Sequence, residues 1–272
     1  MSEWNFMSYD SKDNLLRTVR EEAATMIALA SEPGVWEAPT GAGHWQVRDI
    51  IGHLVDTTEG YFKSFDAARG SGPAPEALGV RGMDQHVDAG AQQFRGTPQG
   101  ELLDRLQTDT AKMMDIFDAL TEEEWGGLLA PHGYMGPLPA FFYPIFQLVD
   151  YALHNWDIRE GQGINHGLNG DSADLLVPLN FILWSATHNC TPDTEPFEIG
   201  IKVTGRNGGD TRMSVGPEGV AFEAGGDISG CAATLEFDPG TLILTAYQRM
   251  NAGTSRGDSE LIDRFRNLFF KI

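Results

Sequence analysis

Three residues of this chain have the types and the spacing that a metal site needs. Asp150 and His154 are four residues apart in a segment predicted to be helical, and residues at i and i+4 lie one above the other on a helix face. A carboxylate and an imidazole in that arrangement can bind one metal ion together. His53, from another predicted helix, would be a third ligand and leave a fourth position open. That is the arrangement of a catalytic zinc-type site rather than a closed structural one.

The same residues also have an ordinary structural interpretation. At about 100° per residue, His53 lies on the flank of the apolar stripe of its helix. Asp150 and His154 lie on the side opposite Ile145 and Trp156. Periodicity alone therefore predicts a solvated face for the pair, and one Asp-x-x-x-His pair on a helix is common by chance. The face becomes a site if a second domain covers it and forms a cleft.

The first 165 residues have the periodicity of long helices. Apolar residues recur at intervals of three and four over four segments, 13–30, 46–68, 99–120 and 140–158. Long helices with loop-rich joints predict a four-helix bundle. The joint over 70–100 is long and rich in glycine and proline, which predicts a crossover connection or a lid. The acidic run 122–124 is interpreted as a solvated helix start.

The pattern changes near residue 165. An apolar helix is predicted over 172–188, and alternation predicts strands at 197–203, 213–215, 220–223 and 233–237. Turns are predicted at 208–210 and 225–227, a helix follows Pro239, and Asp258 caps a last helix over 259–270. We therefore predict an α+β two-domain chain, with a helical bundle over 1–165. The second domain, 166–272, is a small antiparallel sheet with helices on one face.

Composition excludes several functional classes. The 272 residues include 19 Lys and Arg against 39 Asp and Glu, a net charge of −20. Such a chain repels phosphate backbones and anionic lipids, so neither nucleic acid nor a membrane is an expected partner. No apolar run approaches the ~20 residues of a membrane-spanning helix, and no export signal precedes the first helix. A cytoplasmic protein is expected, and the sequence does not indicate an oligomeric state.

The remaining cysteines, histidines and tryptophans receive structural interpretations. Cys190 and Cys231 cannot form a CxxC pair and are expected to be reduced, buried thiols. A functional thiol would then come from outside the protein. His44 is interpreted as an exposed loop residue. No partner at a useful spacing is found for four other histidines, and core or interface positions are expected for four tryptophans: His86, His132, His166 and His188, and Trp36, Trp45, Trp125 and Trp156.

Two motifs resemble those of a known family. The motif Trp-x-Val-Arg-Asp-x-x-x-His-Leu over 45–54 looks like the N-terminal signature of the mycothiol-dependent maleylpyruvate isomerase family, which belongs to the DinB-like metal-binding four-helix bundles. The segment 150–157 resembles the second motif of that family, a carboxylate four residues before a His, then a hydrophobic residue and an Asp. The segment 242–261 is similar to the end of the sterol-carrier-like domain that many members carry.

The resemblance implies roles for individual residues. It makes His53, Asp150 and His154 the ligands of a divalent metal, with zinc expected, and makes Asp157 an acid that orients an imidazole. The family usually has Glu where this chain has Asp150. The shorter side chain implies a shifted site, a water-bridged carboxylate or a lost metal. Arg249 matches a family arginine that reaches towards the substrate carboxylate, and the alternative is a surface arginine at a helix end.

The resemblance also implies a thiol-dependent metalloenzyme. The open metal position would take the sulfur of mycothiol or a similar small thiol, because coordination favours the nucleophilic thiolate. The thiolate would add to the double bond of a substrate such as maleylpyruvate and be eliminated after rotation to the trans isomer. The same first step permits permanent transfer of the thiol, so isomerase and S-transferase are both open. The alternative class is a non-enzymatic small-molecule or lipid-binding protein with a degenerate metal site.

Overall fold

The computed structural model describes residues 2–272, which form two compact units, Ser2–Leu168 and Asn169–Ile272. Two short 3₁₀ helices, Ser2–Trp4 and Tyr9–Ser11, precede the first long helix. Within residues 2–272, every helix falls short of the length and apolar character needed to cross a bilayer.

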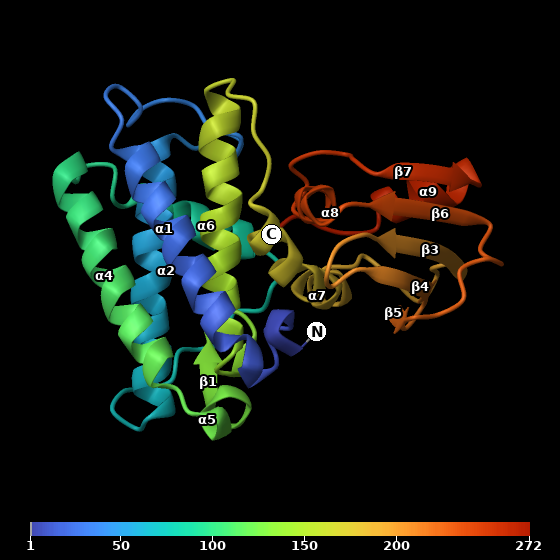
Figure 1. The fold of residues 1–272 in the computed structure, drawn as a ribbon, viewed down its shortest axis with the longest axis horizontal. Helices are drawn as coiled ribbons and strands as arrows, with labels where there is room; N and C mark the ends of the chain where they lie inside the picture. Colours follow the sequence, from blue (N-terminus) through green and yellow to red (C-terminus); the bar gives the residue numbers. More distant parts are fainter. Residues whose placement is uncertain (1) are drawn as a thin grey trace. The chain divides into compact units, whose positions relative to one another are not determined.

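The N-terminal unit is built from long helices that pack against one another (Figure 1). These are α1 (Lys12–Ala30), α2 (Val47–Ala68), α4 (Gln99–Ala119) and α6 (Phe142–Gly161). α1 contacts α4 and α6, and α2 contacts the same two helices. The apolar stripes that predicted these helices form the core, and their predicted ends lie within about three residues of the observed ends. Fully or almost fully buried members of the core include Leu15, Val19, Met26, Ile50, Leu54, Leu106, Phe117 and Ile145.

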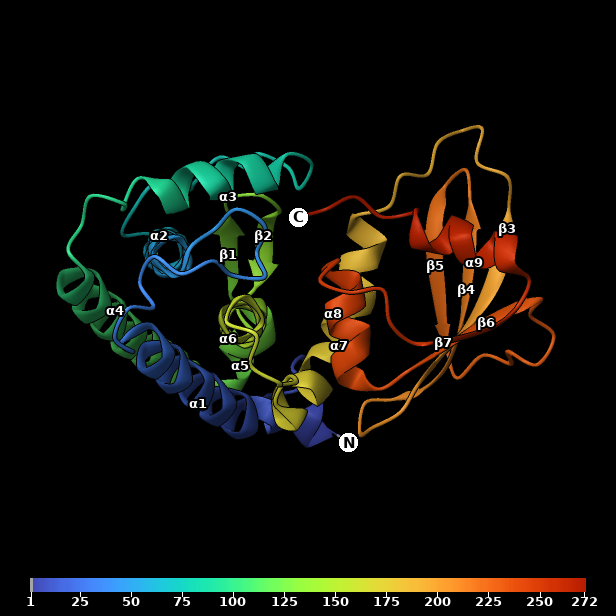
Figure 2. The same ribbon diagram turned by 90° about the horizontal axis from the view of Figure 1, so that it is seen from above.

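The segment 70–100 contains a helix that the sequence analysis did not predict. This helix, α3 (Met83–Gln92), lies beside α2 (Figure 2). The approach is close because residue 52 is glycine: a Cβ there would lie 2.6 Å from the carbonyl oxygen of Ala91. Of the α3 side chains only Ala91 is buried, so the helix has almost no apolar stripe. That absence explains why periodicity missed it.

An ion pair between a buried aspartate and an exposed arginine ties the end of this segment to the start of α2. The carboxylate of Asp49 is fully buried and accepts hydrogen bonds from Arg95 Nε at 2.7 Å and Nη2 at 2.8 Å. It also accepts from the backbone N–H of Gln46 at 2.9 Å, at the N-terminus of the helix. Burial by itself would raise the pKa of Asp49, but the hydrogen bonds from Arg95 and Gln46 hold it below its ordinary value.

A short helix and a hairpin join α4 to α6. The acidic run begins helix α5 (Glu122–Gly127), as predicted, and Thr121 forms a capping box with Glu124. The hairpin of β1 (Leu129–His132) and β2 (Gly136–Pro139) was not predicted. The strands pair antiparallel with His132 opposite Gly136. Four-residue strands that contain three prolines give almost no alternation signal, which explains the omission.

The C-terminal unit contains one sheet with strand order β5-β4-β3-β6-β7 (Figure 1). Its strands are β3 (Phe197–Val203), β4 (Gly209–Gly216), β5 (Gly219–Ala224), β6 (Ala233–Phe237) and β7 (Thr254–Gly257). The prediction of a purely antiparallel sheet is wrong, because β3 and β6 pair in parallel. The chain leaves β5 at the edge of the sheet and passes beyond β3, so β6 cannot continue the meander as a hairpin.

Three helices cover one face of this sheet, as predicted. They are α7 (Gly170–Ala186), α8 (Pro239–Ala246) and α9 (Ser259–Arg266). Alternate strand residues pack against them, and the core includes Trp184, Ile199, Ile201, Val203, Met213, Val215, Leu235, Phe237, Leu242, Ile262 and Phe265.

Four details of the prediction for this unit are corrected. The predicted turn at 208–210 is wrong in part, because Gly209 and Asp210 begin β4. Strand β7 was not predicted, because all four of its residues are exposed and give no alternation. The last helix ends at Arg266 rather than at residue 270. Both cysteines are free, but they are half-buried rather than buried.

Candidate metal centre

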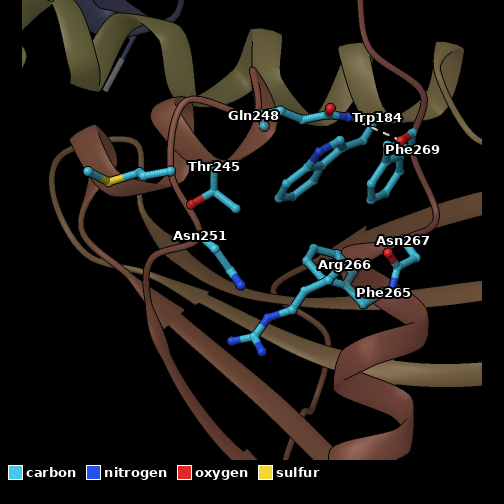
Figure 3. A pocket seen from close by; sticks show the side chains of 10 residues that line it. Trp184, Thr245, Gln248, Asn251, Phe265, Arg266, Asn267 and Phe269 are labelled. Atoms are coloured by element: carbon cyan, nitrogen blue, oxygen red, sulfur yellow. Dashed lines mark hydrogen bonds between the residues drawn. The ribbon is translucent and has the colours of Figure 1, made fainter. Parts of the chain in front are cut away.

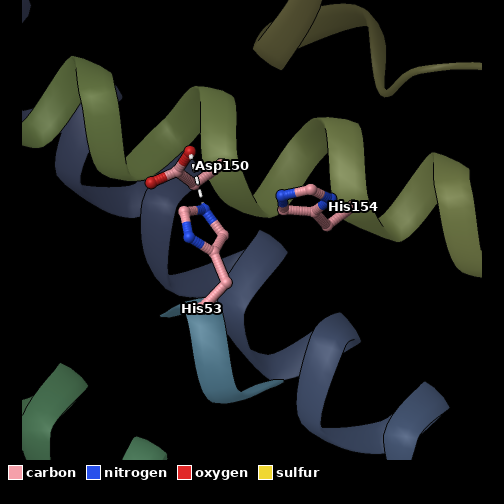
Figure 4. Close-up of side chains that lie close together, drawn as sticks. All are labelled: His53, Asp150 and His154. Carbon is pink, nitrogen blue, oxygen red and sulfur yellow. Dashed lines mark ion pairs between the residues drawn. The ribbon is translucent and has the colours of Figure 1, made fainter. Parts of the chain in front are cut away.

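The structure brings together the three residues singled out as metal ligands. His53 lies on α2, and Asp150 and His154 lie one turn apart on α6 (Figure 4). Each offers one ligand atom, and these atoms all lie within 4.8 Å of one another. His53 Nε2 is 3.6 Å from Asp150 Oδ1, and the two imidazole rings are 5.2 Å apart between centroids. A single ion can therefore reach all three side chains.

Each imidazole has an orienting partner on its Nδ1. His154 Nδ1 lies 2.8 Å from Oδ2 of Asp157, which is fully buried. His53 Nδ1 lies 3.3 Å from the hydroxyl oxygen of Thr57. A carboxylate at Nδ1 holds the proton on that nitrogen, so Nε2 of His154 carries the lone pair that a metal ion requires. Asp157 therefore lies where the resemblance implied an orienting acid.

The solvated face predicted for Asp150 and His154 is wrong for His154. His53 and His154 are only 7% and 6% exposed, whereas the side chain of Asp150 is 22% exposed. α6 contacts both α1 and α2, and its buried residues lie on all of its sides. The amphipathic pattern of one helix assumes one covered face, so it cannot describe a helix enclosed in this way. The partial exposure of Asp150 leaves the cluster open on one side.

Trp45 covers both imidazoles and was interpreted only as a core or interface residue. Its ring centroid lies 5.3 Å from that of His53 and 5.7 Å from that of His154. The indole N–H donates to Oδ1 of Asp88 on α3 at 2.7 Å, and His44 Nε2 contacts the same oxygen at 2.8 Å. The helix missed by periodicity thus fixes one wall of the cluster. One signal in the sequence indicated this role of Trp45, which was its position in the motif over 45–54.

The donor set fits a divalent cation. Two imidazoles and one carboxylate are ligands that zinc accepts, and three protein ligands leave a position for a further group. Thr57 and Asp157 orient the two imidazoles independently of any ion.

Arg249 lies in the C-terminal unit and is not part of this cluster. It follows α8 after Gln248, which has a φ of 55°. Its backbone N–H donates to Leu244 O at 2.8 Å, and its Nη1 donates to Tyr247 O at 3.1 Å. The residue is half-buried. These contacts hold the backbone and the guanidinium group of Arg249 close to the end of α8.

The fold and the cluster define a class: a chain with a helical unit that presents two histidines and a carboxylate to one candidate metal position. Comparison with known proteins identifies the family. The family model described as the mycothiol maleylpyruvate isomerase N-terminal domain matches residues 16–159, and the chain belongs to this family. No curated protein matches the chain at a significant level.

Solved structures with a similar fold agree with the family. Two crystal structures of a mycothiol-dependent maleylpyruvate isomerase, one of them a mutant, each match with a TM-score of 0.60 and 11% identity. Each match covers 91% of this chain and 94% of that one. The colibactin self-resistance protein ClbS, solved with double-stranded DNA, matches with a TM-score of 0.48 and 11% identity. That match covers 57% of this chain and 97% of ClbS, and it is too distant to carry an argument.

The shorter acid at position 150 gives a direct test of the ligand set. Asp150→Glu is expected to bind zinc as tightly as the wild type or more tightly, because it introduces the residue type that the resemblance implies at this position. Titration of the metal-free proteins with zinc against a competing chelator measures this. Asp115→Glu, at an exposed position of α4, is the matched control. A loss of about 10-fold or more, the size typical of a disturbed metal site, would show that the cavity is built around Asp150.

Proposed function

We propose that this chain is a thiol-dependent metalloenzyme that acts on a small electrophile such as maleylpyruvate, either isomerising it or transferring the thiol to it. The observation that carries the proposal is the convergence of His53, Asp150 and His154 within 4.8 Å. Membership of the mycothiol maleylpyruvate isomerase family supports the thiol and the substrate class. In this proposal the metal is zinc and the thiol is mycothiol. The helical unit is proposed to be a DinB-like four-helix bundle, and the C-terminal unit is proposed to be a sterol-carrier-like domain.

Each residue of the candidate centre has a distinct task. His53, Asp150 and His154 would hold the ion, while Thr57 and Asp157 keep the two imidazoles in a fixed orientation. The ion, when bound, stabilises the thiolate form of the small thiol. The tryptophan ring over both imidazoles excludes water from one side of the cluster. The thiol and the substrate approach from the side on which Asp150 is exposed.

The reaction balances without any oxidant or reductant. The thiolate sulfur forms a bond to one carbon of the conjugated double bond, and the electron pair of that bond moves towards the carbonyl. The former double bond is now single and rotates. Elimination of the thiolate restores the double bond in the trans form. If elimination does not follow, protonation gives a stable thioether, which is the S-transferase outcome. The proposed task of Arg249 is to hold a substrate carboxylate in a bidentate contact.

The proposal is tested on the full chain produced with zinc in the medium. We expect about one zinc per chain by elemental analysis, and we expect turnover of maleylpyruvate only when mycothiol is present. Absorbance follows isomerisation, and mass spectrometry of the products distinguishes isomer from thioether. Absence of zinc, or a zinc-loaded protein that neither isomerises the substrate nor forms a thioether, contradicts the proposal.

A second candidate function is the binding of an apolar ligand without catalysis. The C-terminal unit has a cavity of about 400 Å³ (Figure 3). Trp184, Phe265 and Phe269 line one side of it, and the Trp184 and Phe269 rings stack at 5.2 Å. Asn251 and Arg266 add polar groups. Binding of a fatty acid by a protein that holds no zinc and has no thiol-dependent turnover would favour this candidate.

A further inference from the structure

A third imidazole lies beside the candidate metal centre. His132 ends strand β1, and its ring packs against Phe146 of α6 at 5.3 Å and Tyr61 of α2 at 6.1 Å between centroids. Phe146 precedes Asp150 by four residues, so it lies one helical turn, about 5.4 Å, along α6 from a proposed ligand. The hairpin thus brings His132 to the same two helices that carry the candidate metal ligands.

The hydrogen bonds of His132 fix its proton on Nε2. The backbone N–H of Tyr134 donates to Nδ1 at 3.2 Å, so Nδ1 is an acceptor and the ring N–H is at Nε2. Within residues 2–272 none of the hydrogen bonds found uses Nε2, and this atom is not among the fully enclosed polar atoms that lack a partner. Nε2 therefore contributes to the 8% of the residue that is exposed. It offers a donor that the protein itself does not use.

This imidazole is uncharged at neutral pH. Burial lowers the pKa of His132 to about 4, although the negative charge of Asp150 acts in the opposite direction. The other groups packed on the ring are aromatic: Tyr61, Tyr134, Tyr143 and Phe146. A neutral N–H in such surroundings forms a strong hydrogen bond to an oxygen anion, because the low local polarity strengthens the electrostatic attraction.

We propose that His132 binds the substrate, its Nε2–H donating to a carbonyl or carboxylate oxygen of an electrophile whose reacting carbon faces the candidate metal centre. The inference rests on the proposed function and adds a requirement to it. The substrate must carry an oxygen-bearing group a few bonds away from the reacting carbon, because His132 packs against Phe146, which lies about one helical turn from Asp150. Short unsaturated dicarboxylic or keto acids meet this requirement, whereas simple alkyl electrophiles do not.

The test uses two substitutions at this position in the zinc-loaded full chain. His132→Phe keeps a ring in the aromatic cluster and removes the donor, whereas His132→Gln keeps an N–H near the position of Nε2. His86→Phe is the matched control, since the imidazole of His86 is exposed and contacts Gly82 O at 3.1 Å. Two quantities are measured for every variant: the Kd of maleate without thiol, by calorimetry, and kcat/KM with maleylpyruvate and mycothiol.

We expect His132→Phe to weaken maleate binding and to lower kcat/KM by about 10- to 150-fold, the usual effect of losing a hydrogen bond to a charged group. We expect His132→Gln to recover most of both losses, and zinc content and the Tm to stay at wild-type values in all variants. His86→Phe should resemble the wild type throughout.

The outcomes separate this inference from the proposed function. If the wild type has turnover but His132→Phe keeps wild-type kcat/KM and maleate affinity, His132 does not bind the substrate and the proposed function stands. If the wild type has no turnover but binds maleate through His132, the proposed function fails and the binding role stands. Failure of the wild type to bind maleate, or a loss in His132→Phe that Gln does not recover and a lower Tm accompanies, overturns the inference.

Discussion

Replacing His154 with alanine is expected to abolish stoichiometric zinc binding and, with it, thiol-dependent turnover. The substitution removes one of three protein ligands and also leaves the fully buried carboxylate of Asp157 without the imidazole 2.8 Å away. Loss of a residue that only supports a metal ligand typically costs about 10- to 100-fold in affinity, so loss of a ligand should cost more than about 100-fold. Elemental analysis after dialysis and competition with a chelator measure both quantities.

Two companion variants make the result interpretable. His44→Ala removes an exposed imidazole that contacts Asp88 and should retain one zinc per chain. His154→Gln keeps a polar group near Asp157, so it distinguishes loss of the metal ligand from loss of the contact between the imidazole and the buried carboxylate. We expect His154→Gln to fold with a Tm nearer that of the wild type and still to lose zinc. Full zinc content in His154→Ala would remove His154 from the ligand set.

The sequence predicted the parts of the fold that depend on one element at a time. The stripes of α1, α2, α4 and α6 are visible because each of these helices runs for 19 residues or more, and a long amphipathic pattern is a strong signal. The spacing of Asp150 and His154 is likewise a property of one helix. The partner residue, His53, lies on another helix, so its place beside the pair was a hypothesis from its residue type, to which the resemblance of the motif over 45–54 gave the same role.

The parts that the sequence did not predict depend on contacts between elements. α3 has almost no apolar stripe and is held in place by Arg95 and Asp88, whose partners Asp49 and Trp45 lie more than 40 residues earlier in the chain. The burial of His154 follows from helices that surround α6, which no single-helix pattern can show. In the sheet, β3 pairs in parallel with β6. Which strand lies beside β3 depends on how the whole unit packs and not on the sequence pattern of either strand.

The same limitation explains why His132 was passed over. It was judged to have no partner at a useful spacing along the sequence, yet its partners come from the hairpin, from α2 and from α6. A short strand with prolines beside it gives no periodic signal, and the aromatic residues that enclose the ring are distant in sequence. A sequence therefore reveals a functional histidine more easily when its partner lies on the same helix than when its partners lie on several different elements.

Replacing Arg249 with alanine is expected to lower kcat/KM for maleylpyruvate by about 10- to 150-fold, which corresponds to losing about 1.5–3 kcal/mol from a charge-assisted contact with a carboxylate. Zinc content should not change, because the metal ligands are other residues. Arg249→Lys should recover only part of the rate, since an ammonium group cannot form the two parallel hydrogen bonds of a guanidinium. Steady-state kinetics with mycothiol at a fixed saturating concentration measure these differences.

The control for this prediction is Arg256→Ala, which removes an exposed arginine from β7 in the same C-terminal unit. This variant lowers the positive charge by the same amount, so it corrects for any general effect of charge on a chain whose net charge is already −20. We expect its kcat/KM to equal that of the wild type. If Arg249→Ala is as active as Arg256→Ala, the arginine does not hold the substrate. Its contacts with Tyr247 and Leu244 would then be the reason for its position, and the substrate anion would have to be bound by donors of the N-terminal unit, among which His132 is the first to test.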